Sequence, residues 1–364
     1  MASSINASTS GAGGVITTAD NSGILNLQSG GNTVATVQST GFSLPSNSTI
    51  NAANTFGFKN RIINGGMTID QRNAGASVTQ STTATYVLDR FFIYGSVASK
   101  FTAQQNGGSV TPPAGYINYL GITSSSAYTV GASDEFWLAQ RIEGLNIADL
   151  AWGTANAKTV TLSFQIYSSL TGTFGGVLKN SAGNRSYPFT YTISSANTWT
   201  SISITVAGDT TGTWLTTNGI GISVIFGLGV GSTGSGTAGA WAAANYNSAT
   251  GATSVVGTSG ATFYITGVQL EVGSQATSFD FRSYPTEFGM CCRYYQVQNT
   301  KLYSSNDATN TIFNGTWVTK RATPTATLTG ITPTGLFPFV DGYGSYVAGI
   351  AYREVSKVTS DAEL

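Results

Sequence analysis

In four stretches of this chain, every second side chain is apolar. In residues 160–166 every second side chain is apolar, with threonine, serine and glutamine between them. Residues 187–193, 202–206 and 220–226 repeat the pattern. A period of two places all the apolar side chains on one side of an extended chain, so each stretch is predicted to be a β-strand with one buried face.

Ten such strands can be placed before residue 296, separated by clusters of glycine, asparagine and serine. The apolar positions change phase at Gly267, which predicts a β-bulge. So many strands with almost no helix predict an all-β protein, an antiparallel β-sandwich of jelly-roll type. The predicted strands are Met67–Arg72, Val87–Gly95, Phe101–Gln105, Tyr116–Thr123, Phe136–Ile142, Val160–Ser168, Arg185–Ile193, Ser201–Val206, Ile220–Leu228 and Thr262–Glu271.

The chain is predicted to have three parts. Residues 1–58 form an extended N-terminal β arm, residues 59–296 the jelly-roll sandwich, and residues 297–364 a small C-terminal β domain. The C-terminal part is too short to bury a large core alone, so we expect it to pack on the sandwich or on a neighbouring subunit. Its predicted strands are Thr316–Thr319, Ala326–Leu328 and Tyr346–Tyr352.

The arm contains two β-like stretches, Ile24–Gln28 and Thr33–Gln38, with a turn of serine, glycine and asparagine between them. A lone two-stranded hairpin is marginally stable in water, so the arm needs a partner, and the same arm of other copies is the natural one. A disordered tail is the alternative interpretation. The residues expected to serve in oligomerisation and attachment are Ile24, Leu25, Leu27, Val34 and Val37.

Two helical segments are predicted. One is a single turn at Asn146–Leu150, and the other is Glu287–Gln296, capped by Thr286. One face of the second helix carries an apolar stripe, interpreted as core or interface, of Phe288, Cys291, Cys292 and Tyr295. A bridge between adjacent cysteines is strained, so the two are expected to be small buried hydrophobic residues in a reducing compartment.

Composition excludes several functions. The chain has no histidine, which excludes histidine-dependent nucleophile systems and histidine-ligated metals. Lysine plus arginine and aspartate plus glutamate are 16 each, so no basic surface for nucleic acid is expected. No apolar run is long enough to enter a membrane, and the first residues do not resemble a secretion signal. With only 9% charged residues, its faces are expected to be covered by partners or by oligomerisation.

The long loop Gly229–Gly260 is rich in glycine, serine, threonine and alanine. Long loops in compact domains are often functional. Trp241 and Tyr246 can stack on the apolar face of a sugar while Asn245 binds its hydroxyl groups, so these three residues form the predicted glycan site. In the alternative interpretation, the two aromatic residues only fasten the loop to the sandwich or to a neighbouring subunit.

No catalytic residue is predicted. Glycoside hydrolysis needs two carboxylates facing a cleft, but structural ion pairs explain the candidates better, with Glu143 pairing with Arg141 or Arg90. The candidate carboxylates are Asp134, Glu135, Glu143 and Asp149.

No cofactor is predicted either. Asp70, Glu271 and Asp280 are conceivable ligands for a structural calcium ion between sandwich edges, but no calcium-loop pattern supports them.

Several motifs resemble those of bacteriophage tail-fibre and virion-fibre proteins with a carbohydrate-binding-like jelly roll. The resemblance covers most of residues 59–295, and the first and last residues of the chain are similar to those of such proteins. The motifs are residues 17–31, Asn60–Met67, Ile69–Arg72, Leu88–Phe91, Gly267–Gly273, Arg293–Tyr295 and Asp361–Leu364.

The resemblance implies a homotrimeric appendage of the virion. Its N-terminal arm would anchor to other phage tail or capsid proteins, and its sandwich would recognise host-surface polysaccharide, without catalysis. Two other roles stay open: a purely architectural head fibre or baseplate adaptor, and a tailspike-like glycan depolymerase.

Overall fold

The computed structural model describes residues 24–29, 32–38, 41–43, 58–298, 310–329, 335–348 and 357–364. The chain divides into two compact units, Met1–Thr55 and Phe56–Leu364.

The first unit contains the expected hairpin, extended by a third strand. β1 (Leu25–Ser29) pairs antiparallel with β2 (Asn32–Gln38), which pairs with β3 (Gly41–Ser43). Of the residues predicted for oligomerisation, Ile24, Leu25 and Val37 are exposed and Leu27 is half-buried, whereas the side chain of Val34 lies outside the described ones.

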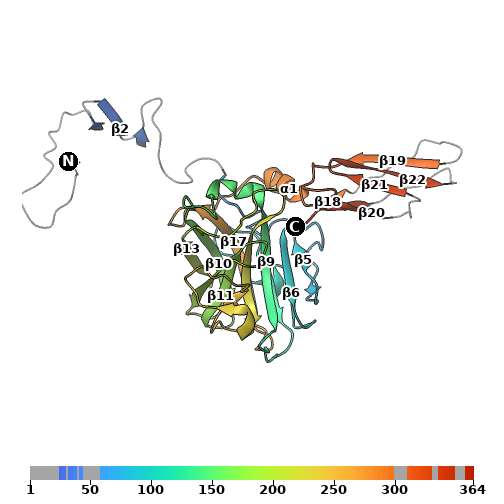
Figure 1. The fold of residues 1–364 in the computed structure, drawn as a ribbon, viewed down its shortest axis with the longest axis horizontal. Coiled ribbons are helices and arrows are strands. Elements are labelled where there is room, and N and C mark those ends of the chain that lie inside the picture. Colours follow the sequence, from blue (N-terminus) through green and yellow to red (C-terminus); the bar gives the residue numbers. More distant parts are fainter. Residues whose placement is uncertain are drawn as a thin grey trace, which may run out of the picture. The chain divides into compact units, whose positions relative to one another are not determined.

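The second unit is built on two six-stranded sheets whose strands all pair antiparallel (Figure 1). We call them the β10 sheet and the β14 sheet. The β10 sheet has the order β13 (Thr200–Val206), β10 (Val160–Ser168), β17 (Thr262–Val272), β8 (Leu120–Ser124), β7 (Phe101–Gln105), β4 (Val78–Thr79). The β14 sheet has the order β12 (Ser186–Ile193), β11 (Gly172–Lys179), β14 (Ile220–Val230), β9 (Glu135–Glu143), β6 (Phe91–Gly95), β5 (Thr85–Leu88).

The alternating apolar residues face each other between these sheets. Phe164 of β10 meets Phe226 of β14 edge to face, with ring centroids 5.1 Å apart, and both are buried. This burial is the main stabilising contribution to the fold. The second unit is therefore an all-β antiparallel sandwich of jelly-roll type, as predicted.

The predicted bulge at Gly267 is also present. Gly267 has φ of +62°, and the register between β10 and β17 shifts at this point. A Cβ at this position would lie 2.5 Å from the hydroxyl oxygen of Tyr116, so glycine allows the tyrosine ring to lie over the bulge.

Two of the strand predictions for residues 59–296 are wrong. Residues 67–72 form no strand, because hydrogen bonds to the Asn64 side chain replace those of strand pairing. The Asn64 side-chain oxygen accepts hydrogen bonds from the main-chain nitrogens of Thr68 and Ile69, each at 2.9 Å, in place of a ladder. The predicted strand 87–95 is a hairpin of β5 and β6, with Arg90 at a φ of +71° in its turn.

Other boundaries shift. The strand expected from Tyr116 begins at Leu120, and strands β4 and β11 were not predicted. In β11, glycines occupy positions where apolar side chains would have shown the alternation typical of a strand. The single turn expected at 146–150 is two 3₁₀ turns, η2 (Gly144–Asn146) and η3 (Ala148–Leu150); two further turns are η1 (Gly107–Ser109) and η4 (Ser232–Gly234).

The helix begins and ends earlier than expected. Helix α1 is Tyr284–Cys292, with Ser283 at its N-cap, so Tyr295 of the predicted stripe lies instead in strand β18 (Tyr295–Gln298). Both cysteines are free and buried, and burial raises the pKa of Cys292 to about 11. No helix within the described ranges is long and apolar enough to cross a membrane.

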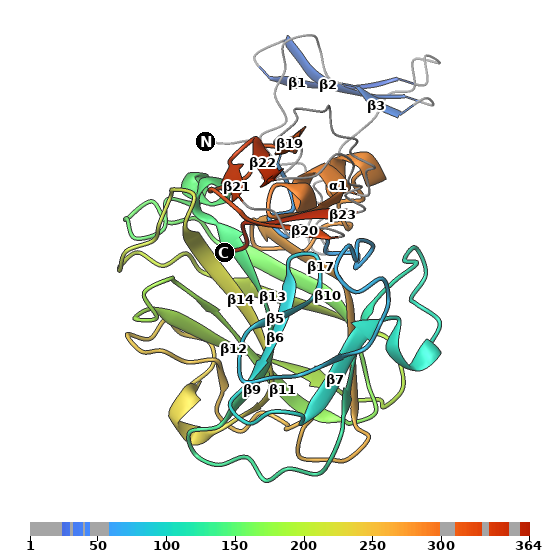
Figure 2. The same ribbon diagram turned by 90° about the vertical axis from the view of Figure 1, so that its right-hand side faces the viewer.

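The C-terminal residues form two three-stranded sheets, β18-β23-β20 and β19-β22-β21. The prediction of a strand at 316–319 is wrong, since β19 already ends at Thr316, and the expected strand 346–352 is described only as far as Ala348. Figures 1 and 2 both place these strands at the end of the sandwich where α1 lies, and Figure 1 shows β18 next to that helix. The strands are β19 (Asn310–Thr316), β20 (Thr325–Thr329), β21 (Gly335–Phe339), β22 (Gly342–Ala348) and β23 (Lys357–Asp361).

Arginines of the second unit hold the final residues in place. Arg72 pairs with Asp361 at 2.9 Å and with Glu363 at 3.3 Å, and the buried guanidinium of Arg90 also pairs with Glu363. Arg321 donates to the main-chain oxygen of Glu363 at 3.0 Å. The end of the chain is thereby fastened to the edge of the β14 sheet.

Candidate ligand-binding face

The outer face of the β14 sheet carries a continuous set of aromatic side chains. The strand registers place Tyr94 beside Trp137 and Tyr86 beside Phe92. Tyr94 and Trp137 stack with ring centroids 4.9 Å apart, and Phe92 meets Trp137 edge to face at 5.6 Å. Tyr86, Tyr94 and Trp137 are half-buried, so part of each ring is accessible. We call these four residues the aromatic face.

A polar row crosses the same side of the sheet. Arg141, Ser223 and Lys179 are paired neighbours on β9, β14 and β11. The Arg141 guanidinium lies over the Phe92 ring, 4.6 Å from its centroid. Within the described ranges, neither Arg141 nor Lys179 forms an ion pair with an aspartate or glutamate. Arg141 donates one hydrogen bond to the main-chain oxygen of Leu364, and the other donors of its guanidinium flank the rings.

The long loop lies across part of this face. Its short strands β15 (Ser235–Gly236) and β16 (Ser248–Ala249) pair in parallel, and β16 contacts β11 and β14. Gly175 and Gly227 allow this approach, because a Cβ at either position would lie 2.6 Å from the hydroxyl oxygen of Ser248. The loop thus covers the β11 and β14 side of the face, next to Trp137.

Two of the predicted glycan residues lie at this edge. Tyr246 packs against the buried cluster of Phe92, Ala139, Val177 and Ile225 on the outer face. Asn245 is exposed, and its side-chain oxygen accepts a hydrogen bond from the Lys179 ammonium group at 3.0 Å.

Burial lowers the pKa of Lys179, and the amide oxygens of Asn245 and Asn247 accept two of its three protons. Asn245 and Tyr246 therefore border the aromatic face.

Trp241 lies elsewhere. Its indole nitrogen donates to the Ala207 oxygen at 2.8 Å, and its ring meets Trp152, Trp214 and Tyr187 edge to face at 5.2–5.4 Å. These contacts fasten the loop to the sandwich, in agreement with the alternative interpretation of this residue. The structure therefore does not bring Trp241 to the aromatic face.

The aromatic face was not predicted from the sequence, although the sequence contains a pattern that indicates it. In residues 91–94 and 136–139 apolar side chains occupy both phases of the strand, where a strand with one wet face should alternate. Phe92, Tyr94 and Trp137 are the outward-facing residues of these runs. An outward aromatic residue in a strand that is not covered by a second layer indicates either an interface or a ligand platform.

Aromatic residues on the outer face of the β10 sheet are used differently. Tyr119 is fully buried; its hydroxyl donates to the Gly107 oxygen at 2.8 Å and accepts from the Val110 nitrogen at 2.8 Å. The Trp199 nitrogen donates to the Thr111 oxygen at 2.8 Å. Loop 106–111 thus occupies the polar groups of this second cluster.

Three of the four candidate carboxylates, Asp134, Glu143 and Asp149, are engaged in internal contacts, and Glu135 lies at the start of β9. Burial alone would raise the pKa of Glu143, but hydrogen bonds from Arg293 and Tyr294 outweigh it and hold that pKa below its usual value. The prediction that Glu143 pairs with Arg141 or Arg90 is wrong. Its partner is Arg293, which lies 150 positions away in the sequence, directly after α1.

Asp149 and Asp134 have structural roles as well. Asp149 pairs with Arg61 through two 2.7 Å contacts, which outweigh burial and lower its pKa. Hydrogen bonds from the Gly131 main chain, Tyr128 and Ser96 lower the pKa of Asp134. Carboxylates held ionised in this way are poor proton donors.

The three conceivable calcium ligands are each engaged by other groups of the chain. Asp70 accepts hydrogen bonds from the main-chain nitrogens of Asn73 and Gly75, and Glu271 binds Thr277. Asp280 pairs with Arg282 at 3.3 Å. Across the described ranges, no group of three or more acidic or cysteine side chains is arranged to hold a metal ion.

No family model matches the chain, and no curated protein matches its sequence. Among solved structures it is similar to the enzymatically active domain of tailspike protein 4 of bacteriophage CBA120, with 12% identity over 59% of this chain and a TM-score of 0.30. The chain covers 21% of that tailspike domain.

It is also similar to a putative sugar binding protein from Bacteroides thetaiotaomicron VPI-5482, with 14% identity over 59% of this chain and 100% of that chain, at a TM-score of 0.34. A family 11 carbohydrate-binding module from Clostridium thermocellum, solved with a mixed-linked tetrasaccharide, shares 12% identity over 56% of this chain and 100% of that chain, at a TM-score of 0.28. Values this low support no conclusion about ligand or site, and the assignment of the fold rests on the strand order itself.

Proposed function

We propose that this protein is a non-enzymatic subunit of a phage virion fibre, and that its aromatic face binds host-surface polysaccharide. The observation that carries the glycan part is the half-buried stack of Tyr94 on Trp137 beside the Arg141–Ser223–Lys179 row. A sugar ring presents apolar C–H groups to an aromatic ring and hydroxyl groups to polar neighbours, and this face offers both.

The assembly part rests on the first unit. Its small sheet exposes Ile24, Leu25 and Val37, and such a sheet gains stability when other copies cover these side chains. We propose that the arm assembles as a homotrimer and anchors the subunit to tail or capsid proteins. The resemblance of the motifs to phage fibres supports this location.

The non-enzymatic part rests on the carboxylates. Asp134, Glu143 and Asp149 are each held ionised by their own partners. A depolymerase would release oligosaccharides from host envelope, and Glu143→Gln would abolish the release. We expect no release of reducing ends from either the native chain or this variant.

The decisive experiment is binding of the full chain to an array of bacterial surface polysaccharides. Trp137→Ala and Tyr94→Ala are expected to lose the signal, because each removes half of the stacking surface. Trp199→Ala on the opposite face is the matched control. Binding that survives Trp137→Ala would refute the site, and no binding by the native chain would favour a purely architectural fibre.

A further inference from the structure

A second surface of the sandwich is apolar, exposed and unrelated to the aromatic face. A cavity of about 280 Å³ opens at the end of the sandwich where α1 begins, lined in part by residues 115–117, 279–282 and 284. Around it, Ile117 is 73% exposed, Phe281 63% and Tyr284 59%. Large apolar side chains this exposed on a contiguous patch mark an interaction surface.

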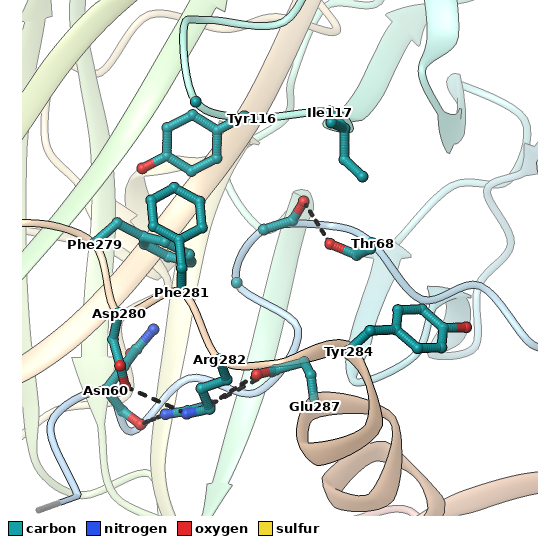
Figure 3. A pocket seen from close by; sticks show the side chains of 13 residues that line it. Asn60, Thr68, Tyr116, Ile117, Phe279, Asp280, Phe281, Arg282, Tyr284 and Glu287 are labelled. Carbon is teal, nitrogen blue, oxygen red and sulfur yellow. Dashed lines mark hydrogen bonds and ion pairs between the residues drawn. The ribbon is translucent and has the colours of Figure 1, made fainter.

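The cavity has rigid aromatic walls. Tyr116, Phe279 and Phe281 pack on one another with ring centroids 4.8–5.4 Å apart. Figure 3 shows these three rings on one side of the cavity, and Ile117 and Tyr284 on the other. Protruding side chains thus stand beside a hollow.

The amide and charged side chains at the cavity are already engaged in contacts within the chain. Asn60 accepts hydrogen bonds from the main-chain nitrogens of Ile62 and Leu270, and Arg282 pairs with Asp280 at 3.3 Å and Glu287 at 3.2 Å. The other polar side chains of the lining are the hydroxyls of Thr68, Tyr116 and Tyr284, so the cavity offers few groups to orient a small ligand. The volume is also below the ~300–1,000 Å³ typical of small-molecule sites, which favours apolar side chains of a protein as the occupant.

The electrostatics of this surface suit a contact between identical chains. A self-contact brings the same charges together, so a face with an unbalanced charge would repel its own copy. Here Arg282 pairs with both Asp280 and Glu287, so the residues lining the cavity carry a net charge of only −1 and the repulsion between two copies is small.

The short connection between this surface and the first unit indicates that another copy of the same chain covers it. Phe58, the first described residue of the second unit, is 41% exposed, and the Arg282 guanidinium of the cavity lies 6.0 Å from its ring centroid. Residues 44–57 connect Phe58 to the small sheet of the first unit. At ~3.3–3.6 Å per residue these 14 residues span at most about 50 Å, so association of the arms keeps the cavity surfaces of the copies within reach of one another.

We propose that the surface around this cavity contacts a second copy of the same chain. Side chains such as Ile117 and Phe281 of one copy enter the cavity of the next, a heterologous contact that closes into a ring. This inference rests on the self-association of the arm in the proposed function, and it adds a second contact, within the sandwich.

The test uses the full chain. Light scattering is expected to give a multiple of 37.6 kDa. Ile117→Cys treated with a short bis-maleimide is expected to give covalently linked chains, because neighbouring copies bring these positions together. Ser259→Cys is the control, since Ser259 is exposed and lies before Thr262, the far end of the 11-residue strand β17. The native Cys291 and Cys292 are buried and do not compete.

A second variant separates contact from tethering. Adding Phe281→Ser to Ile117→Cys is expected to abolish the cross-linked product while the arm still holds the copies together, whereas adding Phe339→Ser, an exposed phenylalanine outside the cavity, leaves the product unchanged.

The outcomes are distinguishable. A monomer in solution overturns both this inference and the assembly part of the proposed function, but leaves glycan binding standing. An oligomer in which Ile117→Cys cross-links no better than Ser259→Cys overturns this inference alone, because the arm is then the sole contact.

Discussion

The guanidinium of Arg90 and the carboxylate of Glu363 form an ion pair inside the protein, although 273 positions separate them. The side chain of Arg90 is 1% exposed and that of Glu363 6%. Tyr294 lies under the guanidinium, with its ring centroid 3.5 Å away. Burial alone would lower the pKa of Arg90, but the Glu363 charge outweighs it and keeps the guanidinium charged. The hairpin turn of β5 and β6 therefore depends on the last residues of the sequence.

Glu363→Gln should destabilise the protein strongly. Removing one partner of a buried pair leaves the other charge uncompensated, which costs about 3–5 kcal/mol. Denaturant unfolding measures the change. Asp361→Asn is the control, because that side chain is 40% exposed and its pair with Arg72 is expected to contribute about 0–1 kcal/mol. A loss for Glu363→Gln no larger than for Asp361→Asn would show that Arg90 finds other compensation.

Trp137→Ala and Trp241→Ala should affect different properties of the protein. Trp137 is expected to matter for glycan affinity, whereas Trp241 packs among Trp152, Trp214 and Tyr187 and is expected to matter for stability. Replacing a buried tryptophan by alanine costs about 3–5 kcal/mol, and half-buried Trp241 should fall near the lower end. Affinity and unfolding free energy measured on both variants check this assignment. A glycan affinity that falls with Trp241→Ala at unchanged stability would restore Trp241 to the site.

Mild acid should stabilise the protein through Asp89. Burial raises the pKa of this carboxyl to about 6, although hydrogen bonds from Gln71 oppose the rise. The folded state then binds the proton more tightly than the unfolded state does, so stability rises as the pH falls through 6 and the gain is complete below the unfolded value. Between pH 7.5 and 5 the gain is about 1 kcal/mol.

Asp89→Asn is expected to remove this dependence, because an amide does not titrate. Unfolding free energies of the two proteins at matched pH values provide the measurement. An equal pH dependence in both would assign the effect to other groups. Below pH 5, protonation of Glu143 and Asp149 lowers the stability, because the folded state holds the pKa of each carboxyl below its unfolded value.

Tyr191→Phe should leave stability unchanged or raise it by about 1 kcal/mol. The Tyr191 hydroxyl is buried and has no hydrogen-bond partner among the described residues, so its removal relieves an unpaired polar group. Tyr119→Phe is the contrast, because that hydroxyl bonds to Gly107 and Val110, and its loss should cost about 1–3 kcal/mol. Thermal unfolding of both variants tests the pair, and a destabilised Tyr191→Phe would show that the Tyr191 hydroxyl forms a stabilising hydrogen bond.

Strand positions followed from local pattern where one face is buried and the other is polar. Strands β7, β10, β13 and β14 were predicted within two residues of their bounds, because apolar and polar side chains alternate along them. The pattern failed where a side chain replaced the ladder, as at Asn64, or where glycines removed the signal, as in β11.

By itself, the sequence determined that the chain is a neutral, β-rich protein with a bulge at Gly267 and without histidine chemistry. These properties depend on composition and on the alternation of neighbouring side chains, both of which are local. The tertiary structure alone decided that Glu143 pairs with Arg293, that Arg90 pairs with Glu363, and that Tyr94 stacks on Trp137. Strand register and chain reversal bring these side chains together from distant positions, and no local periodicity encodes such contacts.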